Sequence, residues 1–150
     1  MWIQSEVVAR LVDDAKWQLV EPIIYQYHNV IITALPGFVT DFASIPAWYK
    51  WRFDPQDKDY AAPAVIHDIL YASEFMPREV NDDVFNQAMM DNDTGDWTRG
   101  VLHKTVRLGG GFTYRAHTRQ TIAKAGLSLK VEVTPPPIDY THEWSNWPIE

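Results

Sequence analysis

The stretch from residue 60 to residue 74 constrains the fold most, because it combines the pattern of an apolar helix with a central His-Asp doublet. Pro63 suits the first turn of a helix, and the apolar residues after it recur at helical spacing. On this helix His67 and Tyr71 share one face, whereas the side chain of Asp68 is turned away by about 100°. A buried polar group without a partner costs about 1–3 kcal/mol, so the rest of the chain must supply partners.

The next predicted helix, over residues 77–91, offers a partner for His67. Its pattern places Asp82 on a stripe that is otherwise apolar, whereas Asp83 should point outward. Only a short turn separates the two helices, which predicts an antiparallel pair. We therefore expect Asp82 to face His67 between two packed helices.

The remaining pattern predicts an α+β fold, with a small N-terminal antiparallel sheet packed on a core of about three helices. Val, Ile, Tyr and Trp alternate with polar residues through residues 5–34, which is typical of strands. The predicted strands are residues 5–12, 16–27 and 29–34. A third helix is predicted over residues 97–108, where Asp96 precedes it and the glycines at 109–111 end it.

Composition favours one domain, residues 1–126, followed by an extended arm. A chain of 150 residues that is 46% hydrophobic is long and apolar enough for one core. From residue 127 the composition changes, and a strand pattern is followed by a run of prolines and two tryptophans. We expect this arm, residues 127–150, to wrap the domain or to dock on another chain, and its tryptophans favour docking.

The charge distribution and the absence of cysteine limit which metal ligands and which classes of partner are expected. Without cysteine, a metal would need histidine, carboxylate or carbonyl ligands. Residues 97–125 are basic within a chain of net charge −7, but no recognition motif accompanies them, so nucleic acid is not an expected partner. No apolar run approaches the roughly 18 residues that span a bilayer, and the N-terminal residues do not resemble a signal peptide. We expect a protein made in a cytoplasm that is not transmembrane.

A motif loop, residues 37–46, lies between the predicted sheet and helices and reads Gly-Phe-Val-Thr-Asp-Phe-Ala-Ser-Ile-Pro. Two alternatives stay open for its polar side chains. Thr40 and Asp41 either hold the loop by local side-chain-to-backbone bonds, or Asp41 faces the helix that carries His67.

The motif loop, followed by His67-Asp68-x-Leu70-Tyr71 and Asp82-x-x-Phe85, resembles an uncharacterised family of tailed bacteriophages and prophages. This resemblance spans roughly residues 15–110 and rests on a long first motif. It implies a phage-encoded protein made in the host cytoplasm, and it implies no established reaction.

The His67-Asp68-x-x-Tyr71 helix, with an acid on the following helix, is also similar to phospholipase A2, including its bacterial forms. By that resemblance His67 would activate water for attack on an ester, and Asp82 with Tyr71 would hold its imidazole. Asp68 would be a calcium ligand. Because no glycine-rich calcium loop precedes this helix, Asp41 or carbonyl oxygens of the motif loop would complete the calcium site.

Three interpretations of this cluster follow. The side chains could form a polar cluster that only fixes how the loop and helices meet, serve a His-Asp hydrolase, or hold a transition metal. A hydrolase would need His67 and Asp68 to line an open cleft, whereas a packing cluster should be closed to solvent.

For the whole chain we expect a structural or accessory virion protein of the tail or baseplate. Its arm, residues 127–150, would join other virion subunits or a second copy of the chain, and the protein would be incorporated in the virion. The alternative is a phospholipase A2-like hydrolase that acts on lipid of the host envelope.

Overall fold

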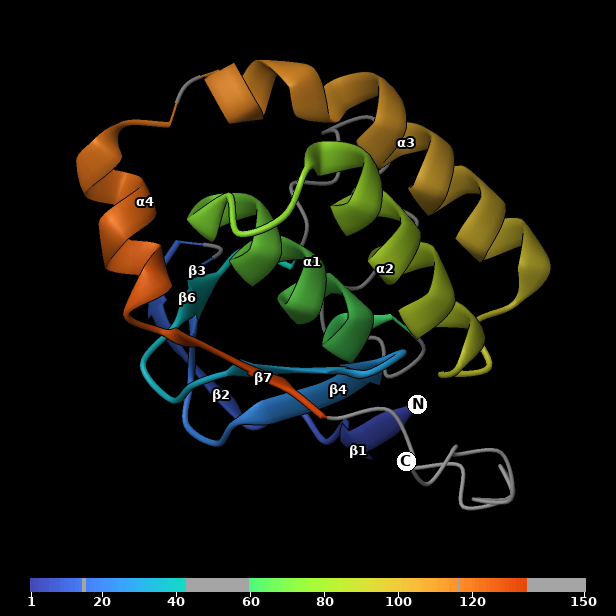
Figure 1. The fold of residues 1–150 in the computed structure, drawn as a ribbon, viewed down its shortest axis with the longest axis horizontal. Coiled ribbons are helices and arrows are strands. Elements are labelled where there is room, and N and C mark those ends of the chain that lie inside the picture. The colour runs from blue at the N-terminus through green and yellow to red at the C-terminus, as the bar shows by residue number, and fades with distance from the viewer. Residues whose placement is uncertain (15, 43–59, 116, 135–150) are drawn as a thin grey trace, which may run out of the picture.

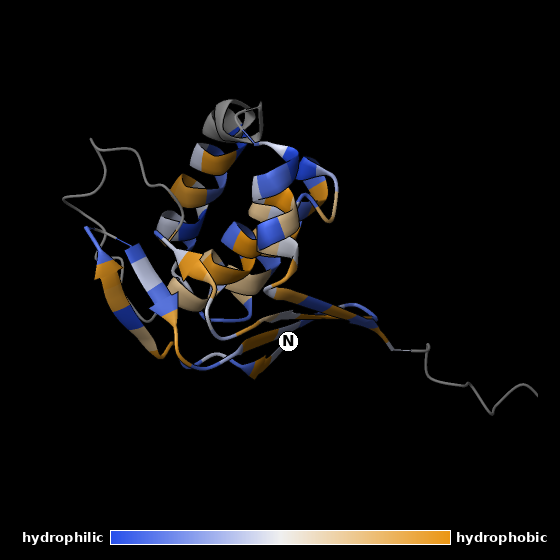
Figure 2. Cartoon of the chain, turned by 90° about the vertical axis from the view of Figure 1, so that its left-hand side faces the viewer, coloured by the Kyte–Doolittle hydropathy of each residue, from blue (hydrophilic) through white to orange (hydrophobic). Residues whose placement is uncertain are grey.

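The computed structural model describes residues 1–14, 16–42, 60–115 and 117–134, and these form an α+β fold (Figure 1). Within them, four helices lie over one face of a four-stranded antiparallel sheet, and a three-stranded antiparallel sheet flanks the first. A side view shows the helical layer above both sheets (Figure 2). The predicted class, with an N-terminal antiparallel sheet packed on helices, is confirmed.

The helices are α1 (Ala61–Ser73), α2 (Arg78–Met90), α3 (Asp96–Arg115) and α4 (Arg119–Gly126). The strands are β1 (Trp2–Gln4), β2 (Ala9–Asp13), β3 (Lys16–Leu19), β4 (Ile23–Tyr27), β5 (Val30–Ala34), β6 (Val39–Thr40) and β7 (Leu129–Val133). The order in the larger sheet is β1-β4-β5-β7, and in the smaller sheet it is β2-β3-β6.

The strand predicted over residues 16–27 is two strands in two different sheets. β3 pairs with β2 and β6, whereas β4 pairs with β1 and β5. The chain leaves the strand conformation between Leu19 and Ile23, at a segment that contains Pro22. Proline has no backbone N–H to give to a ladder, so it favours a break at this point. The alternating pattern on both sides of the break did not show it.

Two further expectations need correction. α3 does not end at residue 108 but continues through the glycines at 109–111 to Arg115. Glycine weakens a helix by about 1 kcal/mol relative to alanine, which is small enough for tertiary packing to override. The predicted arm is not wholly separate from the domain, because β7 pairs with β5 at five positions, from Val30↔Val133 to Ala34↔Leu129.

α1 forms the centre of the core, and ten of its residues are buried. It packs against the larger sheet on one side and against α2 and α4 on the other. A helix that is apolar nearly all round can be stable only when neighbours cover every face, and this burial encloses the polar residues that α1 carries. Among the described residues, no helix has the length and apolar character needed to cross a membrane.

The pairing of β7 generates a prediction about truncation. Deletion of residues 135–150 keeps every strand of the described residues, and we expect the free energy of unfolding to stay within about 0.5 kcal/mol of that of the full chain. Deletion of residues 127–150 removes β7 and should cost at least about 2 kcal/mol, since several ladder hydrogen bonds of about 1 kcal/mol each are lost. Urea unfolding of the two truncated chains measures this difference. Equal stability of both would show that β7 adds nothing to the domain.

Candidate functional site

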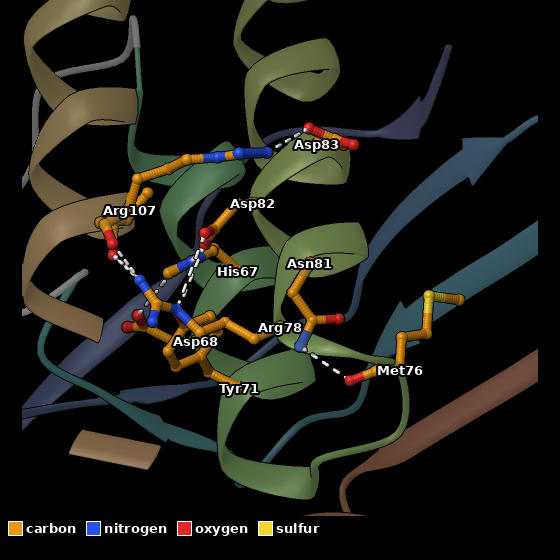
Figure 3. A network of polar contacts seen from close by, with 10 residues as sticks. His67, Asp68, Tyr71, Met76, Arg78, Asn81, Asp82, Asp83 and Arg107 are labelled. Atoms are coloured by element: carbon orange, nitrogen blue, oxygen red, sulfur yellow. Dashed lines mark hydrogen bonds and ion pairs between the residues drawn. The ribbon is translucent and has the colours of Figure 1, made fainter. Parts of the chain in front are cut away.

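The carboxylate of Asp82 lies at the centre of a buried polar network between α1 and α2 (Figure 3). Its Oδ1 accepts a hydrogen bond from the hydroxyl of Tyr71 at 3.3 Å and lies 3.3 Å from Nε2 of His67. Asp82 is 1% exposed and His67 is 5% exposed. Because a buried carboxylate is tolerated only when it is paired and hydrogen-bonded, these contacts account for its position. The structure thus brings together three residues that the sequence singled out.

Two aromatic side chains pack against the imidazole of His67, in addition to its hydrogen bond with Asp82. Its ring centroid lies 4.4 Å from that of Tyr71, one turn further along α1, and 4.7 Å from that of Phe85 on α2. Residues four apart on a helix share a face, which is why His67 and Tyr71 reach the same carboxylate. The two aromatic neighbours restrict rotation of the imidazole.

Arg78 is a fourth member of the network, and the sequence analysis missed it. Its Nε donates to the hydroxyl of Tyr71 at 2.9 Å and lies 3.9 Å from Oδ2 of Asp82. Its Nη2 donates to the backbone carbonyls of Val106 and Arg107 on α3. The guanidinium therefore offsets the charge of Asp82 and ties α2 to α3. The spacing of four residues between Arg78 and Asp82 was the available signal, since such pairs attract on one helix face.

The two nitrogens of His67 differ in their surroundings. Because the carboxylate of Asp82 accepts, Nε2 carries the proton, and Nδ1 is then the unprotonated acceptor of the ring. Nδ1 is buried and has no hydrogen-bond partner among the described residues. It lies 4.0 Å from Oδ1 of Asp68, the next residue on α1. An unsatisfied buried nitrogen destabilises the folded state by about 1–3 kcal/mol. An unpaired nitrogen of this kind in a native protein therefore needs an explanation, which can be structural or functional.

Burial sets the protonation of this site. It lowers the pKa of His67 below the ordinary value, and the hydrogen bond and charge of Asp82 oppose this shift without outweighing it. The imidazole is therefore neutral at pH 7 and able to accept a proton. Burial and the charge of Asp82 raise the pKa of Tyr71 to about 12. The phenol consequently stays protonated and remains a donor to Asp82.

The side chain of Asp68 is held from the smaller sheet. The hydroxyl of Thr40, at the end of β6, donates to Oδ2 of Asp68 at 2.5 Å and accepts from the backbone N–H of Phe42 at 2.9 Å. The local side-chain-to-backbone bond expected in the motif loop is thus present at Thr40. Thr40 is buried and Asp41 is exposed, because successive side chains of an extended segment point to opposite sides. The alternative that Asp41 faces the helix of His67 stays a prediction, and the described bond from the motif loop to that helix comes from Thr40.

The described residues do not fit the calcium site that the phospholipase A2 resemblance implies. Calcium takes about six to eight oxygen ligands, whereas one oxygen of Asp68 is bound by Thr40 and Asp41 is exposed. Among these residues, no group of three or more His, Asp or Glu side chains could hold a metal ion, which also bears on the transition-metal interpretation. The part of the motif loop from residue 43 onward lies outside the described residues.

The lowered pKa of His67 predicts how stability depends on pH. The unfolded chain takes up a proton at His67 near pH 6.5, whereas the folded chain does so only at lower pH, so stability falls as the pH drops below 6.5. The slope from this one group is at most about 1.4 kcal/mol per pH unit. His67→Gln retains a donor for Asp82 but does not titrate, so its unfolding free energy, measured in urea between about pH 5 and 7.5, should depend less on pH. An identical pH dependence in both proteins would contradict this.

Comparison with known proteins identifies a family. No curated protein and no solved structure matches the chain. Residues 17–106 match the family described as "Protein of unknown function (DUF1353)", and this range contains His67, Tyr71, Arg78 and Asp82. Because the match covers more than half of the 150 residues, the chain belongs to this family of unknown function.

Proposed function

We propose that the chain is a hydrolase in which His67 activates a water molecule for attack on a carboxylic ester. One observation carries this proposal: Nδ1 of His67 is buried and has no hydrogen-bond partner among the described residues, while Nε2 is held by Asp82. A base needs one nitrogen anchored and the other available, and this imidazole has that division.

A histidine that served packing alone would gain stability from a partner on each nitrogen. The network around Asp82 satisfies its other members: Tyr71 both donates and accepts, and Arg78 reaches two backbone carbonyls. The missing bond falls on the atom that a general base would use. This favours chemistry over packing as the reason for the arrangement.

In the proposed reaction, Nδ1 of His67 takes a proton from water as the water oxygen attacks the ester carbonyl. The imidazolium that forms is stabilised through its Nε2–H by Asp82, which Tyr71 and Arg78 hold in place. When the tetrahedral intermediate breaks down, His67 returns the proton to the departing alcohol. Asp68, beside Nδ1, can accept a hydrogen bond from the same water.

Exposure of the site bears on access for a substrate. His67 is 5% exposed, and the side chain of Asp68 is 15% exposed. A substrate would therefore approach from the side of Asp68, and the dry surroundings of His67 would strengthen its interaction with Asp82. Burial of this degree is what the packing interpretation expects, whereas the hydrolase interpretation expects an open cleft, so substitution has to separate the two interpretations.

The substrate class follows from the resemblance to phospholipase A2. We propose that the ester belongs to a lipid of the host envelope, hydrolysed during entry or lysis by a phage. The uncharged ester carbonyl suits an apolar site that contains a neutral base.

Two neighbouring acids on α2 provide a matched test of catalysis. His67→Ala and Asp82→Asn should lower kcat/KM for phospholipid or p-nitrophenyl ester hydrolysis by about 10²–10⁴-fold, because a positioned general base contributes that much. Asp83→Asn should leave activity within about twofold, since the side chain of Asp83 is 57% exposed and forms its ion pair with Arg107, outside the network around Asp82. A stopped assay on purified protein measures this.

Two results would contradict the proposed hydrolase. If the unsubstituted chain hydrolyses no ester, and His67→Ala only lowers stability, the network is a packing cluster. If Asp83→Asn loses as much activity as Asp82→Asn, the loss does not report on the network.

We also propose a role in the virion, as a tail or baseplate component whose arm joins neighbouring subunits or a second copy. The supporting observation is the position of Thr134, the last described residue. Thr134, just after β7, bonds twice to the carbonyl of Asn29, with its N–H at 2.7 Å and its hydroxyl at 3.0 Å. Among the described residues β7 is an edge strand of the larger sheet, and edge strands can pair with another chain. Thr134 is thus held in place beside an edge strand.

Deletion of residues 135–150 should therefore abolish assembly while β7 and the fold remain. Sedimentation of the purified chain and immunoblots of purified particles compare the truncated chain with the full one. We expect the truncated chain to be monomeric and missing from particles, with an unchanged circular dichroism spectrum. Unchanged association and unchanged incorporation would refute the role of the arm.

A further inference from the structure

The hydroxyl of Thr40 links the smaller sheet to the candidate site. It is buried, donates to Oδ2 of Asp68 at 2.5 Å and lies 2.9 Å from the backbone nitrogen of Phe42. A hydroxyl has one proton to donate, and a backbone N–H can only donate. Thr40 must therefore accept from Phe42, and its single proton goes to Asp68. The direction of both bonds is fixed by chemistry.

The backbone around Thr40 is set by the sheet and by an unusual turn. Thr40 pairs with Trp17 of β3, and the rings of Trp17 and Phe42 lie 6.2 Å apart. Phe42 has a φ of +57°, a left-handed conformation that bulky residues rarely adopt, and it is 2% exposed. Such conformations persist where the surroundings determine them, and they cluster at functional sites. The position of the hydroxyl is thus determined by groups outside α1.

Anchoring one oxygen of Asp68 determines where the other lies. A free aspartate on a helix surface can take several rotamers, and residues 67 and 68 of α1 point about 100° apart. With Oδ2 held by Thr40, Oδ1 lies 4.0 Å from Nδ1 of His67. This separation is too long for a direct hydrogen bond but can be bridged by one water molecule bonded to both atoms.

We propose that Thr40 is a positioning residue, which through Asp68 places the water molecule that His67 activates. The proposal rests on the hydrolase function proposed above. It assigns a role in that function to the smaller sheet.

Two substitutions separate the hydroxyl from the shape of the side chain. Thr40→Val keeps the shape and removes the hydroxyl, whereas Thr40→Ser keeps the hydroxyl. Crystal structures of the unsubstituted chain and of Thr40→Ser should show an ordered water between Nδ1 of His67 and Asp68. In Thr40→Val, Asp68 should turn away from His67 and the water should be lost.

Kinetics give an independent measurement. Thr40→Val should lower kcat for ester hydrolysis by about tenfold to a hundredfold with KM changed less than about twofold, because misplacing a reacting group by about 1 Å has an effect of that size. Thr40→Ser should restore kcat to within about threefold of the unsubstituted value. A residue that only stabilised the fold would change the melting temperature without this division between kcat and KM.

The outcomes of the two experiments are distinguishable. An unsubstituted chain without esterase activity would end the hydrolase proposal, whereas the crystal structures would still decide whether Thr40 places Asp68 and a water. An active Thr40→Val with Asp68 unmoved would overturn the role of Thr40 and leave the hydrolase intact. If Thr40→Val does not fold, the absence of a bridging water in the unsubstituted crystal structure would overturn the inference by itself.

Discussion

The buried carboxylate of Asp82 is the constraint on which the rest of the structure depends. An ionised acid in an apolar interior is costly, and it persists here because Tyr71, Arg78 and His67 surround it. These partners come from α1 and α2, and Arg78 extends the network to carbonyls of α3. Three helices therefore have to meet in one register. A shift of a single turn between them would leave a charge buried without its partners.

The contact with Asp82 also makes the surroundings of the two ring nitrogens of His67 different. Asp82 anchors Nε2, while Nδ1 faces Asp68, whose carboxylate is held from the opposite direction by Thr40. Asp82 of the helical layer thus contacts one nitrogen of His67, and Thr40 of the smaller sheet holds the acid beside the other. A neutral histidine that is anchored through one nitrogen by a carboxylate can act as a general base through the other. The family to which the chain belongs has no assigned function, so the proposal stands on these contacts and not on kinship.

The helices that carry the site could be predicted because their information is local. Periodicity and the short turn between α1 and α2 were enough to place Asp82 opposite His67, and both lie on the expected faces. The sheet was less predictable. Strands acquire their neighbours through contacts distant in sequence, so alternation could not show that β3 and β4 belong to different sheets or that β7 completes the larger one.

What the sequence determined by itself was the polar content of one central helix and the acid that faces it, since 3.6 residues per turn fixes which side chains share a face. Only the tertiary structure decided that Thr40 reaches Asp68, that Arg78 completes the network, and that Nδ1 of His67 is buried. These depend on how separate elements dock against each other. No spacing within one segment encodes that docking, because it is set by the packing of all segments together.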